Sequence, residues 1–158
     1  IGHSDTVVSL IFNKNNELIS GSLDHLIKIW DIKTGKCIRN LTGHEARIQS
    51  LLINKDDELI SGAENGLIKI WNMTTGECKK NLTGHTNTVY SMIINKENEL
   101  ISAGLNDRTI KVWNMTTGQF KRDLIVNHPG MIYSIVINQN NELISGSFDK
   151  IITIWNIT

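Results

Sequence analysis

The sequence is poor in the residue types that mark several protein classes. Among 158 residues there are two cysteines and one proline, and the longest mainly apolar runs span five or six residues. A membrane-spanning helix needs about 20 apolar residues, so these runs exclude one. The cysteines, Cys37 and Cys78, are too few for a disulfide framework and too far apart for a paired zinc ligand set, and we expect reduced thiols.

The chain also has no excess of charge of either sign. Sixteen Lys and Arg residues balance sixteen Asp and Glu residues, so the net charge is zero. This balance argues against a dedicated nucleic-acid-binding domain, which usually carries a basic patch, and against a polybasic membrane anchor. With 20% charged and 40% hydrophobic residues, the composition is that of a folded globular domain rather than a disordered chain. No secretion signal pattern is recognised at the start.

A repeat of about 42 residues runs through the whole sequence. The four tryptophans recur at intervals of 41, 42 and 42 residues: Trp30, Trp71, Trp113 and Trp155. A Glu-Leu-Ile-Ser segment recurs with them, its leucines being Leu18, Leu59, Leu100 and Leu143. No linker interrupts the pattern, so we expect one segment over 1–158 with repeats at about 2–42, 43–83, 84–126 and 127–158.

Each repeat has the pattern of short strands joined by turns. In the first repeat we expect strands over 7–12, 18–20, 26–32 and 37–41, because β-branched residues are enriched there and Asn, Asp and Gly lie between them. No helical stripe competes with this pattern. Four short antiparallel strands cannot bury both faces of their sheet, so the repeats must stack on one another, as they do around the axis of a propeller.

These features resemble the WD40-repeat β-propeller family. The resemblance is carried by Gly-His pairs such as Gly43-His44, by the Trp30-Asp31 pair and by the four-strand unit of about 42 residues. Asn follows the other three tryptophans, and Asn127 stands where the fourth Gly would be. The resemblance implies an all-β fold of four propeller blades in which the last outer strand is missing. We expect them to be part of a seven- or eight-bladed ring; a closed four-bladed ring and a dimer completing an eight-bladed ring are the alternatives.

The resemblance further implies a buried hydrogen-bonded tetrad of His, Ser, Asp and Trp in every blade. An indole N–H can only donate, so Ser accepts from Trp and donates to His, and His donates to the carboxylate. The expected tetrads are His3, Ser20, Asp24, Trp30; His44, Ser61, Asn65, Trp71; His85, Ser102, Asp107, Trp113; and His128, Ser145, Asp149, Trp155. Asn65 replaces the acid in the second tetrad. We expect its amide oxygen to accept in the same way, but without charge, and blade 2 to be weaker.

A Ser-His-Asp set also suggests a hydrolase, but this interpretation is rejected. The set recurs in step with the tryptophans, whereas a catalytic triad occurs once. The histidines of four blades would lie too far apart to share a metal ion. We therefore expect no catalytic residue, no metal and no cofactor. Basic pairs on the expected outer strands (Lys36 and Arg39, Lys79 and Lys80, Lys121 and Arg122) are interpreted as protection of an exposed sheet edge.

In the family, the loops that enter each innermost strand and the turns between second and third strands open on one end of the ring, the top face. Large apolar residues in two of these turns, and tyrosines where innermost strands begin, are typical of an interaction hot spot. The candidate partner-binding residues are Leu23, Arg47, Glu64, Thr88, Tyr90, Asn106, Met131, Tyr133 and Phe148.

The expected function is that of a non-catalytic protein–protein interaction scaffold, which binds a peptide or protein on the top face within a multiprotein assembly. The alternative is a regulatory or sensor propeller of a larger enzyme-containing polypeptide, such as a ubiquitin-ligase adaptor or a signalling ATPase or kinase. No small-molecule substrate, no nucleic acid and no membrane insertion are expected. A cytoplasmic location is expected, with nuclear or ciliary settings as alternatives.

Overall fold

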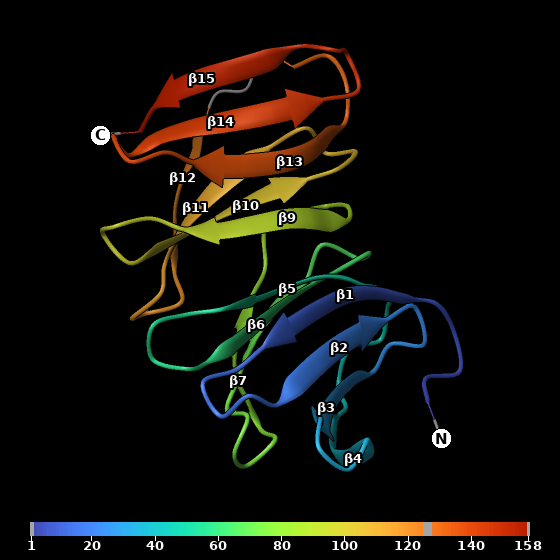
Figure 1. Ribbon diagram of the computed structural model, residues 1–158. Coiled ribbons are helices and arrows are strands. Elements are labelled where there is room, and N and C mark those ends of the chain that lie inside the picture. The colour runs from blue at the N-terminus through green and yellow to red at the C-terminus, as the bar shows by residue number, and fades with distance from the viewer. Residues whose placement is uncertain (1, 125–127, 158) are drawn as a thin grey trace.

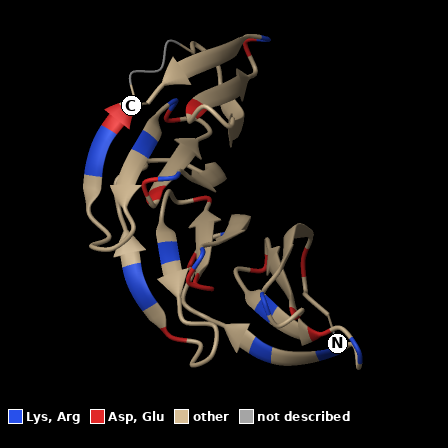
Figure 2. Ribbon diagram, turned by 60° about the vertical axis from the view of Figure 1, so that its left-hand side comes forward, with Lys and Arg blue, Asp and Glu red and all other residues tan. Residues whose placement is uncertain are grey.

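The computed structural model describes residues 2–124 and 128–157, and in this part of the chain all regular structure is β-strand. The strands form four separate antiparallel sheets, which stack side by side along an arc (Figures 1 and 2). We call these sheets blades 1 to 4 in chain order. Asn127, the expected substitute for a Gly, lies outside the described residues, as do Ile1 and Thr158.

Within each blade the strands follow one another from the inside of the arc to its outside. Blade 1 consists of β1 (Val7–Phe12), β2 (Leu18–Ser22), β3 (Ile27–Asp31) and β4 (Lys36–Leu41). Blade 2 consists of β5 (Ile48–Ile53), β6 (Leu59–Ala63), β7 (Ile68–Trp71) and β8 (Cys78–Leu82). Blade 3 consists of β9 (Val89–Ile94), β10 (Glu99–Gly104), β11 (Ile110–Asn114) and β12 (Phe120–Leu124). Blade 4 consists of β13 (Ile132–Ile137), β14 (Glu142–Ser147) and β15 (Ile152–Asn156), so its sheet has three strands.

The expected four-strand unit and the three-stranded last sheet are confirmed. β1 has the expected bounds, whereas β2 extends two residues further than expected, to Ser22. The extension arises because Gly21 pairs with Ile27 and Ser22 pairs with Val7 across a register shift in β1. The glycine that marks a turn in the sequence is therefore a strand residue.

The hairpin turn between the first two strands of each blade is closed by one asparagine side chain. In blade 2, Asn54 Oδ1 accepts hydrogen bonds from the backbone N–H groups of Asp56 and Glu58, and Asn54 Nδ2 donates to the Glu58 carboxylate at 2.8 Å. Asp57 in this turn has a φ of 60°, a left-handed conformation that Asn and Asp tolerate better than most residues. The Glu before each Leu-Ile-Ser segment thus belongs to the turn.

The apolar cores lie between blades rather than within them. Between blades 1 and 2, residues of β2, β3 and β4 pack against residues of β5, β6 and β7, with Trp71 only 1% exposed. The junctions between blades 2 and 3 and between blades 3 and 4 repeat this arrangement. Each blade therefore has a front face, which contacts the preceding blade and carries the Trp side chain, and a back face, which contacts the next blade.

Polar contacts from the outer strands also cross the junctions. Lys80 Nζ on β8 donates to the carbonyl oxygens of Met115 and Thr116 in blade 3, at 3.0 and 2.6 Å. Arg122 on β12 donates to the Ile157 carbonyl oxygen at 3.1 Å and lies 3.6 Å from the Glu99 carboxylate. The basic residues along the outer edge of the arc (Figure 2) thus also join neighbouring blades, a role that the edge-protection interpretation missed.

Close approach of two blades predicts that Gly62→Ala destabilises the fold. A Cβ atom at Gly62 would lie 2.6 Å from Ser50 Oγ and 2.7 Å from a methyl carbon of Val89 on blade 3. Overpacking of this kind costs about 1–3 kcal/mol. Urea denaturation measures the loss. Gly2→Ala is the matched control, because a Cβ there meets no atom within 4 Å. Equal stability of the two variants would contradict the tight junction.

Candidate protein-interaction site

The residues of the expected tetrad lie together in blade 1. The indole Nε1 of Trp30 donates to Ser20 Oγ at 2.7 Å, and Ser20 Oγ lies 2.6 Å from Nε2 of His3. Nδ1 of His3 lies 2.9 Å from a carboxylate oxygen of Asp24. This geometry fits a neutral histidine that accepts from the serine and donates to the acid. Burial raises the pKa of the Asp24 carboxyl, but hydrogen bonds from backbone N–H groups and from His3 outweigh it and hold this pKa at about 2.

Blades 3 and 4 repeat the same chain of hydrogen bonds. In blade 3 the histidine Nδ1 lies 2.7 Å from the acid and the indole N–H donates to the serine at 2.8 Å. In blade 4 the corresponding distances are 2.8 and 2.9 Å. The residues are His85, Ser102, Asp107 and Trp113, then His128, Ser145, Asp149 and Trp155. In both blades the hydrogen bond from histidine helps to lower the pKa of the acid, against the opposing effect of burial.

Blade 2 differs from the expectation for Asn65. Trp71 and His44 both bond to Ser61, at 2.8 and 2.6 Å, but His44 Nδ1 is buried without a hydrogen-bond partner in the described part of the chain. Asn65 is exposed, and its one acceptor oxygen takes the backbone N–H of Leu67. A carboxylate has two acceptor oxygens and can hold the backbone N–H with one and the histidine with the other, whereas the single acceptor oxygen of Asn65 is turned to Leu67. Burial, with a smaller effect from the positive charge of Lys69, lowers the pKa of His44 to about 4.

Burial of the tetrad serines excludes them as nucleophiles of a hydrolase. The tetrad serines are 0–2% exposed, and each hydroxyl already accepts from an indole and lies against a histidine. A nucleophile must reach a substrate, and these cannot. The described residues also contain no cluster of three or more His, Cys, Asp or Glu side chains that could hold a metal ion. The arrangement suits the satisfaction of buried polar atoms rather than chemistry.

At the top face, each turn between second and third strands is held to the loop that enters the first strand of its own blade. The backbone N–H of Leu23 donates to the Thr6 carbonyl oxygen at 2.9 Å, and that of Phe148 donates to Met131 at 2.9 Å. Glu64 donates to Arg47 in the same way at 2.8 Å. Turn and loop are thus joined within each blade, and we call the row of these joined turns and loops along the top face the rim.

The residue at this position in blade 3 is Leu105, not the expected Asn106. The Leu105 N–H donates to the Thr88 carbonyl oxygen at 2.8 Å, whereas Asn106 is exposed and donates to the Asn87 side chain. The sequence comparison missed Leu105 because the third repeat has one extra residue in this turn. Three of the four rim positions are therefore apolar: Leu23, Leu105 and Phe148.

The other expected partner-binding residues differ in exposure. Phe148 is 68% exposed, and Tyr90 and Tyr133 are about two-fifths exposed with their rings edge to face, 5.5 Å between centroids. Met131 is partly buried and its sulfur contacts the Tyr133 hydroxyl. Thr88 departs from the expectation, because it is buried and its hydroxyl donates to the Glu64 carbonyl oxygen.

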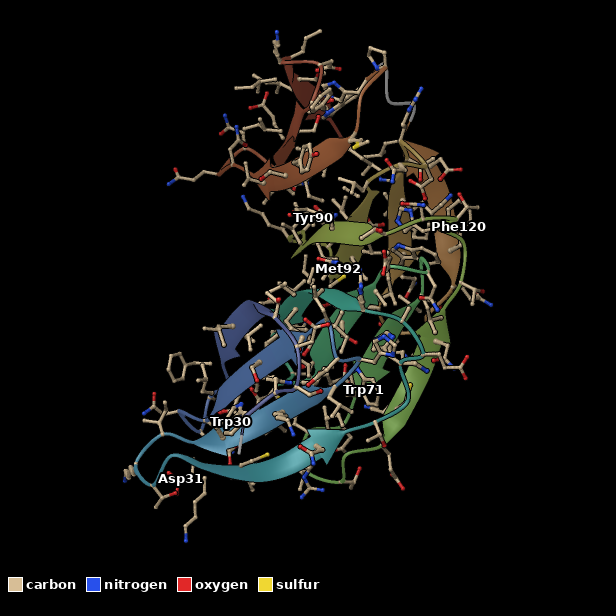
Figure 3. All side chains as sticks on the ribbon, turned by 90° about the vertical axis from the view of Figure 1, so that its right-hand side faces the viewer. Trp30, Asp31, Trp71, Tyr90, Met92 and Phe120 are labelled. Atoms are coloured by element: carbon tan, nitrogen blue, oxygen red, sulfur yellow. The ribbon has the colours of Figure 1, made fainter. Side chains whose placement is uncertain are left out.

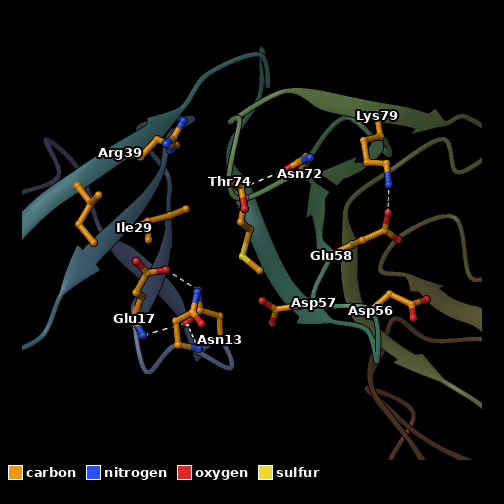
Figure 4. A pocket seen from close by; sticks show the side chains of 13 residues that line it. Asn13, Glu17, Ile29, Arg39, Asp56, Asp57, Glu58, Asn72, Thr74 and Lys79 are labelled. Carbon is orange, nitrogen blue, oxygen red and sulfur yellow. Dashed lines mark hydrogen bonds and ion pairs between the residues drawn. The ribbon is translucent and has the colours of Figure 1, made fainter.

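One groove adjoins Tyr90, and another lies away from the candidate partner-binding residues. One, of about 470 Å³, runs along the innermost strands β1, β5 and β9 and is lined by Val8, Gln49, Tyr90 and Met92 (Figure 3). The other, of about 530 Å³, lies between blades 1 and 2 at the opposite end from the rim (Figure 4). Two carboxylates of the second groove are already bound within the chain: Glu58 pairs with Lys79, and Glu17 accepts from the Asn13 amide. The first groove is the better candidate for a ligand.

The four-bladed arrangement with a tetrad in three of its blades agrees with the family to which the sequence matches. A family model described as "WD domain, G-beta repeat" matches residues 1–31, 35–72, 76–114 and 119–156. The chain belongs to the WD40 repeat family. Each matched segment after the first begins close to an outer strand and ends at the Trp strand of the next blade, so it links two sheets. Propellers of this family are in general non-catalytic domains that bind other proteins.

Solved structures agree with this assignment. The chain superimposes on the WD40 beta propeller domain of Doa1 with a TM-score of 0.90 and 27% identity, covering 99% of this chain and 53% of that one. It superimposes on the computationally designed Ika4 protein with a TM-score of 0.87 and 34% identity, covering 94% of that chain. For the designed Ika8 protein the TM-score is 0.85 and the identity 34%, but only 47% of that chain is covered.

Curated relatives match over single repeats. F-box/WD repeat-containing protein 7 of Drosophila melanogaster is 40% identical over 42 residues, which are 27% of this chain and 3% of that protein. The Ribosome biogenesis protein BOP1 homolog of Drosophila erecta is 49% identical over 41 residues, which are 25% of this chain and 5% of that protein. The described residues include no helix long and apolar enough to cross a membrane.

The buried Nδ1 of His44, which has no hydrogen-bond partner among the described residues, predicts a pH-dependent stability that Asn65→Asp removes. Because the pKa of His44 is about 4 in the folded state and 6.5 ordinarily, the unfolded state binds more protons between these values. Stability is therefore full above pH 6.5 and falls as the pH decreases toward 4, by up to about 3 kcal/mol. Asn65→Asp supplies the missing acceptor, which raises the pKa of His44 and adds about 1–3 kcal/mol at pH 7.

Urea denaturation at pH 7 and pH 5 measures both effects. Asn106→Asp is the matched control, because it adds the same charge to an exposed top-face turn in blade 3, whose own tetrad acid, Asp107, is present. The interpretation is wrong if Asn65→Asp loses as much stability between the two pH values as the unsubstituted chain does.

Proposed function

We propose that this chain is a non-catalytic interaction module that binds a peptide segment of another protein on its top face. The observation that carries the proposal is the rim, where apolar side chains occupy the same turn position in three blades. Phe148 is 68% exposed, and Leu23 and Leu105 are half-buried. A row of partly accessible apolar side chains, together with two exposed tyrosines, is typical of a binding surface.

The charges of the rim fit a peptide that is not strongly charged. Arg47 and Glu64 lie 3.9 Å apart with about half of each side chain exposed, so they are a weak surface pair whose charges offset one another. The groove along β1, β5 and β9 is lined by polar and apolar residues in turn, such as Gln49 beside Tyr90. A partner with an aromatic or aliphatic anchor, flanked by polar residues, suits this surface.

The matches to named proteins support the assignment to the WD40 repeat family but do not favour a particular biological role for this chain. One relative is an F-box/WD repeat-containing protein and another a ribosome biogenesis protein, and each matches over one repeat. The alternative of a regulatory propeller in a larger enzyme-containing polypeptide is favoured by no residue of this chain. We further propose a cytoplasmic location, as expected from the sequence.

Selection from a random peptide library displayed on phage tests the proposal. We expect the selected peptides to share an apolar anchor, and Leu23→Ser or Leu105→Ser to weaken their binding about tenfold, which corresponds to about 1.4 kcal/mol. Phe120→Ser is the matched control, because Phe120 is 46% exposed on the outer strand β12 of blade 3 (Figure 3). Binding that is lost with Phe120→Ser but kept in the rim variants would overturn the proposal, as would a selection that yields no binder.

A further inference from the structure

Blade 2 departs from the repeat at two adjacent positions. The acid position of its tetrad holds Asn65 instead of Asp, and the next residue is Gly66. In the other blades the acid is followed by a residue with a large side chain: His25, Arg108 and Lys150. The two departures together create the one Asn-Gly pair among the 158 residues. The pair lies in the turn between β6 and β7 (Figure 1).

An asparagine followed by glycine readily loses its side-chain amide, because glycine has no Cβ to hinder its own backbone nitrogen. That nitrogen attacks Cγ of the asparagine and forms a cyclic succinimide, while the side-chain nitrogen leaves as ammonia with the proton of the glycine N–H. Water then opens the ring at Cγ, which restores the peptide bond and yields aspartate. Opening at the main-chain carbonyl yields isoaspartate instead. No group is oxidised or reduced, and water is the co-reactant.

Two features of the turn favour this attack, and one hydrogen bond must break before it. The Asn65 side chain is exposed, so water can reach it and ammonia can leave. The backbone N–H of Leu67 donates to Oδ1 of Asn65 at 3.2 Å, which stabilises the negative charge that develops on this oxygen during the attack. The Gly66 N–H donates to the Ala63 carbonyl oxygen at 3.1 Å, so the reaction needs a local opening of the turn.

The turn of blade 2 is held by fewer hydrogen bonds than the same turn in blade 1. There the tetrad acid accepts from Nδ1 of the histidine and from two backbone N–H groups. Asn65 accepts from the Leu67 N–H, and Nδ1 of His44 has no partner in the described part of the chain. Blade 2 has a neighbour on each face, so this difference belongs to its own sequence. Its turn can open with the loss of fewer contacts.

We propose that Asn65 deamidates spontaneously in the folded chain and that the aspartate formed completes the second tetrad. One carboxylate oxygen keeps the Leu67 N–H and the other accepts from Nδ1 of His44. Asp24 and Asp107 divide their two oxygens in this way in blades 1 and 3. The added hydrogen bond holds the turn closed, which opposes a second ring closure at the aspartate, so the reaction limits itself.

The surroundings of His44 favour a carboxylate over an amide at position 65. Burial lowers the pKa of His44 to about 4, with smaller effects from Lys69 and from His25 when it is protonated. A carboxylate beside the ring opposes these effects, so the pKa of His44 rises on conversion. Deamidation therefore changes the titration of His44 and the stability of blade 2 as well as the mass of the chain. It also adds a negative charge beside the rim residue Glu64.

Storage of the purified full chain in mildly alkaline buffer made with oxygen-18 water, followed by peptide mass mapping, tests the reaction. We expect the amide at position 65 to become a carboxyl group that carries one solvent oxygen, before any other asparagine changes. Asn106 is the internal control, because it is exposed in the corresponding turn of blade 3 but precedes Asp107. An amide that persists at position 65, or isoaspartate as the accumulating product, would overturn the proposal.

Comparison of stored with fresh protein tests the structural consequence. In urea denaturation at pH 7 we expect the unfolding equilibrium constant of the stored chain to be about tenfold smaller, equivalent to about 1.4 kcal/mol. In an NMR titration we expect the pKa of His44 to rise from about 4. Asn65→Asp should show both changes when fresh and no further change on storage. Aspartate that forms at position 65 without either change would contradict completion of the tetrad.

Asn65→Gln separates deamidation at this position from other effects of storage. Glutamine keeps the amide, but its longer side chain closes a ring with the next nitrogen much more slowly, so the stability of this variant should stay constant. Gly66 is left unchanged, because a Cβ atom there would collide with the His85 carbonyl oxygen. If Asn65→Gln gains as much stability on storage as the unsubstituted chain, the gain has another source and the proposal is wrong.

Discussion

The packing of one blade face on the next is the constraint on which the rest of this structure depends. A sheet of four short strands is apolar on both sides and has no core of its own, so every core here is shared between two blades. The close approach explains Gly21 and Gly62 on the second strands of blades 1 and 2, whose Cβ atoms would collide with the following blade. It also explains why Lys80 and Arg122 bond to carbonyl oxygens of the next blade rather than of their own.

The repeat made most of the fold predictable from the sequence, because each blade uses the same residue types at the same positions. Recurring tryptophans predicted the blades, and β1 has its expected bounds. Details that depend on a single atom or a single inserted residue were not predictable. Asn65 has one acceptor oxygen where a carboxylate has two, and that oxygen binds Leu67, so Nδ1 of His44 has no partner in the described part of the chain. One extra residue moved the rim position of blade 3 from Asn106 to Leu105.

The residues of each repeat have two separate roles. The polar residues of the tetrad stabilise the blade, and the turn residues of the rim form the exposed surface. Ser, His and Asp look like catalytic residues in the sequence, but they bond to one another around a buried indole and leave no free hydroxyl at the surface. What is left exposed on the rim is set by the turn between second and third strands, which no core contact fixes. Residues such as Leu23 can therefore vary without any cost to the tetrad, as the proposed binding role of the rim requires.

The exposure of a rim residue depends on whether its blade has a neighbour on both sides. Thr88 of blade 3 donates to the Glu64 carbonyl oxygen of blade 2, so the turn of blade 2 is completed in part by the loop of the following blade. Leu105, Glu64 and Arg47 belong to blades with a neighbour on both sides, and their exposure is that of a finished rim. Phe148 belongs to blade 4, on whose back face no blade packs among the described residues. Its 68% exposure therefore reflects both the chemistry of the rim and the open junction, so Leu105 represents the binding surface better than Phe148 does.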